Sequence, residues 1–171
     1  SPPYLFFDGA ATYVWHDNAS DADLNGGSNF SCAVLLDPEV ANLSQSGTVC
    51  GKHDPSGTQF GWEVRWDKTT GLVTVVVSTS LDGTNRVERL NATAIRTRSI
   101  LVFTYDGTDI RIVLNGATDE GTQTPTGTPG AMVTTTAKFG IGARVNSATT
   151  GSNFYRGAVC GVWIWNVTLT L

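Results

Sequence analysis

Short runs of β-forming residues, each followed by a turn signal, recur along the whole chain of 171 residues. Thr, Val and aromatic residues fill these runs, and Gly, Asn, Asp and Pro cluster between them. Asp-Gly and Asn-Gly pairs, which favour hairpins because their turns need positive φ, begin at Asp8, Asp82, Asp106 and Asn115. No long stretch has apolar residues at the i, i+3, i+4 and i+7 spacing of an amphipathic helix. We therefore expect an all-β fold with minimal helix.

This succession of strands and turns predicts one architecture for the whole chain. Short strands joined by turns are typical of an antiparallel two-sheet β-sandwich, or jelly roll. We expect a single sandwich domain over residues 1–171, in which the Thr-, Gly- and Pro-rich stretch 119–129 is one long surface loop. The predicted strands cover residues 4–7, 12–15, 30–36, 48–52, 60–66, 72–79, 85–90, 100–105, 110–114, 139–144 and 154–165.

Alternation of side chains predicts which face of a strand is buried. In residues 60–66 the polar face carries Glu63 and Arg65, and we expect a solvated surface there. The opposite face is apolar and should pack in the core; it carries Phe60, Trp62, Val64 and Trp66.

The last predicted strand is apolar on both faces. Simple alternation puts Cys160, Val162 and Ile164 on one face and Val159, Trp163 and Trp165 on the other. A strand of this kind is either covered on both sides or presents aromatic rings to a partner. We therefore take Trp163 and Trp165 as candidate ligand- or partner-binding residues.

Composition excludes several classes of partner. The hydrophobic fraction is 40% and the charged fraction 15%, which indicates a folded chain. The net charge is −4, and the basic residues are scattered, with only Arg96 and Arg98 close together, so nucleic acid is not expected as a partner. No apolar run approaches the roughly 18 residues of a membrane span. Ser1-Pro2-Pro3 shows no signal-peptide pattern.

Several segments, in their order along the chain, resemble the laminin-G-like branch of the concanavalin A-like lectin/glucanase superfamily. They are LFFDG (5–9), NFSCAVLL (29–36), GTVCGKHD (47–54), GWEVR (61–65), YDGTDIRIVLNG (105–116), FGIGAR (139–144) and FYRGAVCGVWIWN (154–166). The resemblance implies a lectin-like sandwich and a functional range from glycan-binding and adhesion modules to some glycoside hydrolases. Where such domains commonly carry an acidic pair in the closing strand, this chain has Cys160 and Gly161, and Trp163 replaces a polar residue.

A catalytic centre is not apparent in the sequence. Hydrolases of the resembled superfamily carry E-x-D-x-x-E on one strand, whereas here Glu63 and Asp67 are separated by Arg65 and the third acid is missing. His16 and His53 fall in different predicted loops and are expected at the surface. We therefore expect a protein that is not an enzyme, with a glucanase-like hydrolase as the least favoured alternative.

Calcium is the one cofactor that the sequence suggests, and the alternative is no cofactor. Ca²⁺ prefers carboxylate, amide and carbonyl oxygens gathered in a loop. The segment 17–23 offers such oxygens, with Asp17, Asp21 and Asp23 as candidate metal ligands. Laminin-G-like domains often bind calcium at a loop rim, but these residue types are also ordinary turn formers.

The three cysteines, Cys32, Cys50 and Cys160, lie in apolar stretches and are expected as small buried hydrophobes. A Cys32–Cys160 bridge is left open. Free thiols favour production in a reducing compartment.

Together these features favour a non-enzymatic surface-binding or decorating module, which binds a glycan or protein surface and sits on a bacteriophage virion as capsid decoration or tail component.

In that setting the chain is made in the host cytoplasm, its partners are capsid or tail proteins, and self-association is left open. The alternative is a carbohydrate-binding module of a larger secreted bacterial protein.

Overall fold

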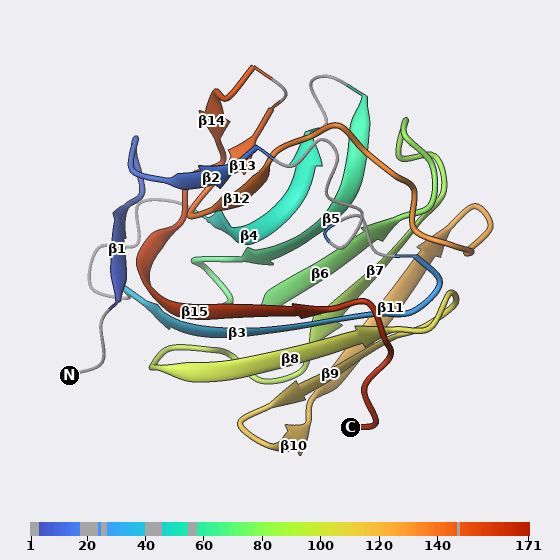
Figure 1. The fold of residues 1–171 in the computed structure, drawn as a ribbon. Helices are drawn as coiled ribbons and strands as arrows, with labels where there is room; N and C mark the ends of the chain where they lie inside the picture. The colour runs from blue at the N-terminus through green and yellow to red at the C-terminus, as the bar shows by residue number, and fades with distance from the viewer. Residues whose placement is uncertain (1–3, 18–23, 25–26, 40–45, 55–57, 147) are drawn as a thin grey trace.

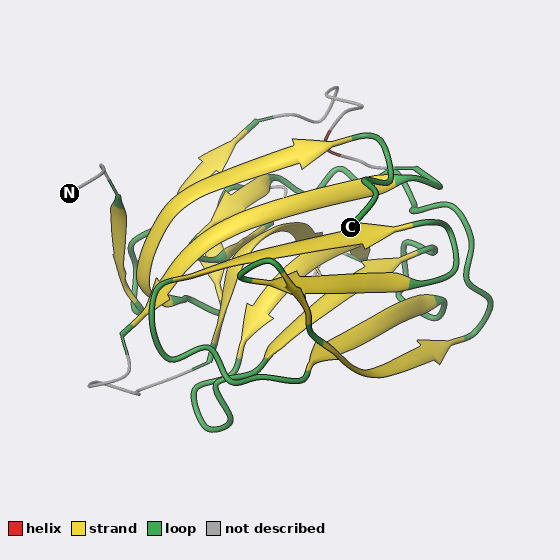
Figure 2. Ribbon diagram, turned by 90° about the horizontal axis from the view of Figure 1, so that it is seen from below, coloured by secondary structure: helices red, strands yellow, loops and turns green. Residues whose placement is uncertain are grey.

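The computed structural model describes residues 4–17, 24, 27–39, 46–54, 58–146 and 148–171. All its named elements are strands, and two antiparallel sheets pack face to face (Figures 1 and 2). The predicted all-β sandwich is confirmed. None of the described segments is a helix long and apolar enough to cross a membrane.

The first sheet, sheet A, has six strands, with β1 and β10 at its edges. In spatial order they are β1 (Leu5–Asp8), β15 (Arg156–Trp165), β3 (Phe30–Pro38), β8 (Ser99–Tyr105), β9 (Ile110–Leu114) and β10 (Ala117–Thr118).

The second sheet, sheet B, has seven strands, and a separate two-stranded hairpin accompanies it. The spatial order is β11 (Glu120–Thr126), β7 (Arg86–Asn91), β6 (Val73–Ser78), β5 (Gln59–Trp66), β4 (Gly47–Asp54), β12 (Phe139–Ile141) and β2 (Val14–His16). The hairpin consists of β13 (Arg144–Val145) and β14 (Gly151–Ser152). Its β13 strand contacts β4.

Aromatic side chains from both sheets fill the space between them. Trp62 and Trp66 are buried, as the alternation predicted. The ring of Trp62 lies 5.0 Å from that of Phe30 and 6.0 Å from that of Phe103, and both of these belong to sheet A. Burial of such rings supplies much of the hydrophobic stabilisation of a sandwich core.

The prediction that Phe60 shares the core face with Trp62 is wrong. Between the pairs Lys52↔Trp62 and Asp54↔Gln59 the register shifts, so that β5 holds one residue more than β4. This β-bulge turns Phe60 to the outer face of sheet B, where its ring packs edge-on against His53 at 4.8 Å.

A second bulge corrects the expected faces of β15. Val159 pairs with Leu36 and Gly161 with Leu35, so β15 carries one extra residue between them. Val159 therefore faces the core together with Val162 and Ile164, instead of sharing the outer face with the two tryptophans. Trp163 and Trp165 point outward, 46% and 37% exposed.

Residues 120–126 form an edge strand, where a surface loop was expected. β11 pairs with β7, and Arg89 donates hydrogen bonds to Gln123 and Glu120 across the pair. Both faces of this strand are largely exposed, so it needs no apolar alternation, and Pro125 is tolerated at a sheet edge. The sequence therefore carried no period-2 signal to reveal it.

The predicted Asn115-Gly116 turn closes a hairpin, whereas the predicted Asp8-Gly9 turn does not. Asn115 and Gly116, with φ of 52° and 85°, close the two-residue hairpin between β9 and β10 as predicted. The Asp8 turn closes no hairpin, because β1 pairs in sheet A and β2 in sheet B. Its carboxylate instead accepts backbone N–H groups from Ala10, Ala11 and Thr12, and so carries the chain between the sheets.

None of the three cysteines is bridged, and Cys32 and Cys50 are buried as expected. Cys160 is half-buried in the β15 bulge, whereas Cys32 lies opposite Ile164 in the sheet register. The Cys32–Cys160 bridge left open by the sequence is therefore not formed.

We predict that Gly47→Ala destabilises the fold by about 1–3 kcal/mol, because added core volume forces backbone shifts. A Cβ at Gly47 would overlap the backbone of Phe154 and Tyr155, which cross β4 there. Thermal unfolding of both proteins measures the difference. Gly130→Ala is the matched control, since a Cβ there meets nothing within 4 Å. Equal stability of the two variants would contradict this account.

Candidate functional site

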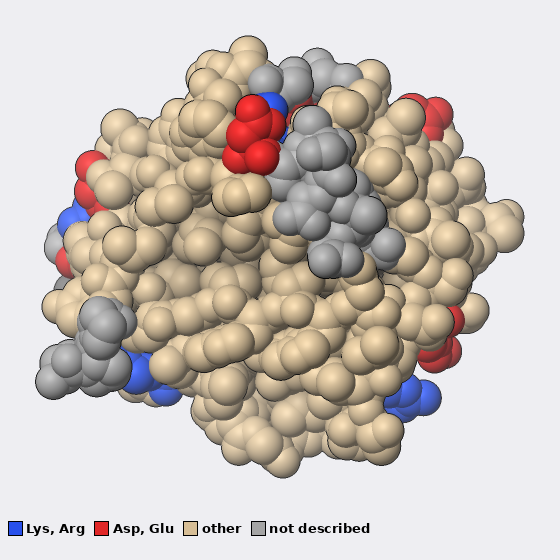
Figure 3. Space-filling view, in the orientation of Figure 1, with Lys and Arg blue, Asp and Glu red and all other residues tan. Residues whose placement is uncertain are grey.

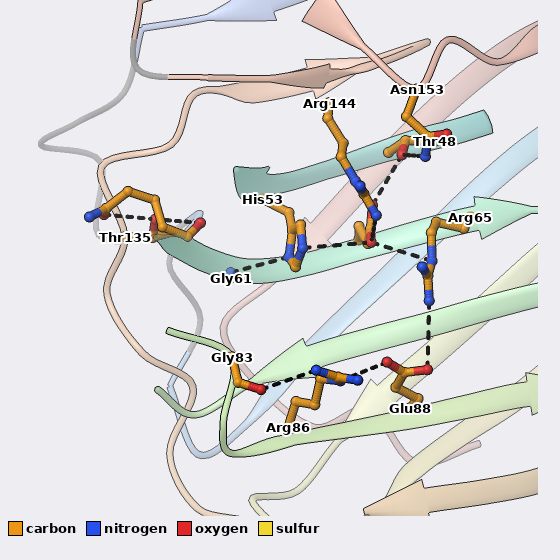
Figure 4. A network of polar contacts seen from close by, with 12 residues as sticks. Thr48, His53, Gly61, Arg65, Gly83, Arg86, Glu88, Thr135, Arg144 and Asn153 are labelled. Carbon is orange, nitrogen blue, oxygen red and sulfur yellow. Dashed lines mark hydrogen bonds and ion pairs between the residues drawn. The ribbon is translucent and has the colours of Figure 1, made fainter. Parts of the chain in front are cut away.

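A polar cleft of about 160 Å³ opens on the outer face of sheet B, and we name it the Glu63 cleft. Side chains from β4, β5, β6, β7 and β13 line it, and Figure 4 shows its network of polar contacts. The lining residues are His53, Phe60, Glu63, Arg65, Val76, Arg86, Glu88 and Arg144.

Glu63 forms the floor of this cleft and is 1% exposed, which corrects the expectation of a solvated strand face. Arg144 donates two hydrogen bonds to its carboxylate, from Nε at 2.8 Å and from Nη2 at 2.6 Å. The Thr48 hydroxyl donates a third at 3.0 Å. Burial would raise the pKa of Glu63, but the Arg144 hydrogen bonds and the surrounding charges outweigh burial and hold this pKa below its ordinary value.

His53 is buried on β4 beside Glu63, and the prediction of a surface loop residue is wrong. Burial lowers the pKa of His53, with help from the charges of Arg144 and Arg65, although the Glu63 charge opposes this shift. The imidazole is therefore neutral at neutral pH, and its 3.8 Å approach to Glu63 is not an ion pair there. Its Nδ1 accepts the Gly61 N–H at 3.4 Å. The predicted strand ended one residue before it, whereas His16 is exposed as expected.

Arg65 differs from the other two arginines of the cleft in how it is held. Its Nε lies 3.3 Å from Glu63 Oε1 and its Nη2 lies 3.6 Å from Glu88 Oε2. Within the described part of the chain its buried Nε donates no hydrogen bond. Arg86, by contrast, donates to Glu88 at 2.7 Å and to the Gly83 carbonyl at 3.2 Å. The Arg65 side chain is nonetheless 34% exposed, so the terminal amino groups of its guanidinium, unlike the buried Nε, remain as donors for a ligand.

A second cleft of about 240 Å³ continues along the same face, and we name it the Thr74 cleft. Its lining residues are Ser46, Gly47, Arg65, Trp66, Asp67, Thr74 and Asn153. Arg65 lines both clefts. On the neighbouring strand β4, Thr48 lies opposite Arg65; its hydroxyl accepts from Asn153 Nδ2 at 2.9 Å and donates to Glu63 (Figure 4).

The two acids considered for hydrolysis occupy different surroundings. Glu63 is bound by Arg144, whereas Asp67 accepts backbone N–H groups of Thr69 and Thr70 at the end of β5. The Thr70 hydrogen bond is the largest of several that hold the pKa of Asp67 below its ordinary value. A glycosidase needs one carboxyl group with a raised pKa as proton donor, and neither of these acids provides it.

Trp163 and Trp165 lie on the opposite side of the sandwich, on the outer face of sheet A. They line an apolar groove of about 500 Å³ with Ala33, Ile100, Val102, Leu169, Thr170 and Leu171. In Figure 3 the charged side chains of the visible face lie toward its edges, and the middle, where β15, β3 and β8 run in Figure 1, is uncharged. The structure therefore brings the two predicted tryptophans together, but away from the polar clefts.

Of the three candidate calcium ligands, one lies within the described residues. Asp17 is exposed, and its carboxylate pairs with Lys138. Asp21 and Asp23 lie outside the described residues. In the part of the chain that the structure describes, no group of three or more His, Cys, Asp and Glu residues is placed to hold a metal ion. Calcium at this loop stays a prediction.

Comparison with known proteins supports the fold. The laminin G family model described as the concanavalin A-like lectin/glucanases superfamily matches residues 8–171. Among curated proteins, none matches the sequence.

Among solved structures, similar folds occur in a bacterial glycan-binding module and two animal proteins. The CBM40 module of the Ruminococcus gnavus IT-sialidase, bound to α2,3 sialyllactose, has a TM-score of 0.69 at 9% identity, covering 98% of this chain and 94% of that one. Mouse laminin α1 domains LG4-5 have a TM-score of 0.66 at 10% identity; the match covers 96% of this chain but only 43% of the laminin chain. The heptameric SAP-like pentraxin of Limulus polyphemus has a TM-score of 0.61 at 12% identity; the match covers 96% of this chain and 76% of the pentraxin chain. At these identities the likeness is one of fold.

We predict that Glu63→Gln lowers the stability at pH 7 by about 1.5–3 kcal/mol, because it removes the charge that accepts two hydrogen bonds from the partly buried Arg144. The folded-state pKa of Glu63 lies below its unfolded value. The stabilisation by the ionised group is therefore complete above the unfolded pKa and disappears as the pH falls through the folded one. The gap between wild type and variant should accordingly shrink in acid.

Denaturant unfolding at several pH values measures this gap. Glu88→Gln is the control, since Glu88 is 29% exposed and its removal should cost less than about 1 kcal/mol. A Glu63→Gln variant as stable as wild type at pH 7 would refute the role of Glu63 as the buried anchor.

Proposed function

Because this chain belongs to the laminin G family of the concanavalin A-like lectin/glucanases superfamily, we propose that it is a non-enzymatic glycan-binding module. We place the ligand in the Glu63 cleft and take it to be a sugar that carries a carboxylate. The superfamily's fold alone does not decide function, so the proposal rests on the chemistry of this cleft.

Arg65 is the observation that carries the proposal. Its guanidinium lies at the cleft wall, 34% exposed, and among the described residues it is held by the two longer ion pairs to Glu63 and Glu88 alone. A planar guanidinium with free donors suits bidentate binding of a carboxylate. The cleft lining carries three arginines against two glutamates, and His53 is neutral, so one positive charge is in excess. The half-buried ring of Phe60 supplies an apolar wall for a sugar ring.

The bound ligand of one fold neighbour agrees with this chemistry. The Ruminococcus gnavus module was solved with α2,3 sialyllactose and also with α2,6 sialyllactose. Sialic acid carries one carboxylate, so sialyllactose is a suitable first probe for this chain.

The apolar groove suits a different occupant. A sugar needs hydrogen-bond partners for its hydroxyl groups, and the groove offers few: among its described lining side chains they are the Thr170 hydroxyl and the indole N–H groups of Trp163 and Trp165. Exposed tryptophans in an apolar surface are typical of protein contacts. Trp163 and Trp165 therefore stay predicted as partner-binding residues, with a protein surface as the favoured partner.

The biological setting expected from the sequence stays a prediction. A place on the exterior of a bacteriophage virion, against capsid or tail proteins, has no support in the fold or its neighbours. Stoichiometric recovery of the chain in purified particles would establish that setting. Recovery from a processed secreted protein would instead favour the alternative of a module of a larger secreted bacterial protein.

Isothermal titration calorimetry with α2,3 sialyllactose and with lactose tests the proposed site. We expect wild type to bind the sialylated sugar and to bind lactose much more weakly. Arg65→Ala should weaken sialyllactose binding roughly 10- to 100-fold, because a hydrogen bond to a charged group contributes about 1.5–3 kcal/mol. Neither sugar should be cleaved during long incubation.

Trp163→Ala is the matched control on the opposite face and should bind as wild type does. Unchanged binding by a folded Arg65→Ala variant, or loss of binding in Trp163→Ala alone, would refute the proposed site. In the second case the glycan would bind at the apolar groove.

A further inference from the structure

We infer that the Glu63 cleft and the Thr74 cleft form one binding groove, divided by Arg65, that takes a glycan of at least two sugar units. The acidic unit occupies the Glu63 cleft and a neutral neighbouring unit the Thr74 cleft. This inference rests on the proposed function and adds the length and the direction of the ligand.

The sheet register places the two clefts in line. Arg65 pairs with Thr74, and Glu63 pairs with Val76, so the clefts follow one another along the β5–β6 pair. Successive residues on one face of a strand are about 7 Å apart, a distance on the scale of a single sugar ring. Neighbouring units of one chain could therefore occupy neighbouring clefts.

Of the described residues, Arg65 alone lines both clefts. It is partly exposed, and the ion pairs that hold it are longer than the hydrogen bonds that fix Arg86 and Arg144. Beside it, the hydrogen bonds Asn153–Thr48–Glu63 run continuously from one cleft to the other. The divide between the clefts is therefore a single, partly exposed side chain.

The two clefts differ in the sugar chemistry they accept. Apart from Arg65, the polar side chains of the Thr74 cleft are the hydroxyls of Ser46 and Thr74, the amide of Asn153 and the carboxylate of Asp67. Hydroxyl, amide and carboxylate groups bind sugar hydroxyls, whereas the Asp67 charge disfavours a second acid there. An acidic sugar therefore binds in the Glu63 cleft and a neutral one in the Thr74 cleft.

Calorimetry with the methyl glycoside of sialic acid and with α2,3 sialyllactose tests the inference. Wild type should bind the longer sugar at least about 10-fold more tightly, since each 1.4 kcal/mol of added contact is a factor of ten. Thr74→Trp fills the Thr74 cleft. This variant should lose the tighter binding of the longer sugar, so that the ratio of its two affinities approaches one, whatever the indole does to methyl glycoside binding through the neighbouring Arg65.

Ile100→Trp, which adds an indole to the exposed face of sheet A, is the matched control. It should bind sialyllactose more tightly than the methyl glycoside by the same factor as wild type. Equal affinities of wild type for the two sugars would overturn the two-part groove and leave the proposed function intact. A folded Thr74→Trp variant that still binds the longer sugar more tightly by the wild-type ratio would also overturn it, because the second unit would then lie outside the Thr74 cleft. Failure of wild type to bind either sugar would overturn the groove and the proposed function together.

Discussion

The contact between Glu63 and Arg144 connects the outer face of sheet B to the segment that follows β12. Its two short hydrogen bonds join residues 81 positions apart in the chain. They hold the carboxylate ionised in a buried place, and the charge of that carboxylate also draws Arg65 to within 3.3 Å. The floor and the wall of the proposed glycan site therefore both depend on this ion pair, which also joins β13 to β5.

Two β-bulges decide which side chains reach each surface. The bulge in β5 brings Phe60 out of the core and beside His53, where it can form an apolar wall of the Glu63 cleft. The bulge in β15 buries Val159 while Trp163 and Trp165 stay outside. Each inserts one residue, and a shift of one residue moves every side chain beyond it to the other face.

The sandwich presents different chemistry on its two outer faces. Sheet B offers guanidinium, carboxylate and hydroxyl groups in two adjoining clefts, which suits a polar ligand. Sheet A offers an apolar groove with two exposed tryptophans, which suits a protein surface. Because the core separates the faces, a glycan and a protein partner could be bound at the same time.

The sequence by itself determined the strand-rich sandwich, most strand positions and the buried Trp62 and Trp66, and it singled out Trp163 and Trp165 as candidate binding residues. These features depend on local alternation and turn residues, which are readable within a few positions. Only the tertiary structure decided the burial of Glu63 and His53, because Arg144, which pairs with Glu63, comes from a distant segment. It also decided the outward turn of Phe60 and the edge strand β11, since a bulge or an exposed edge leaves no periodic signal in the residues.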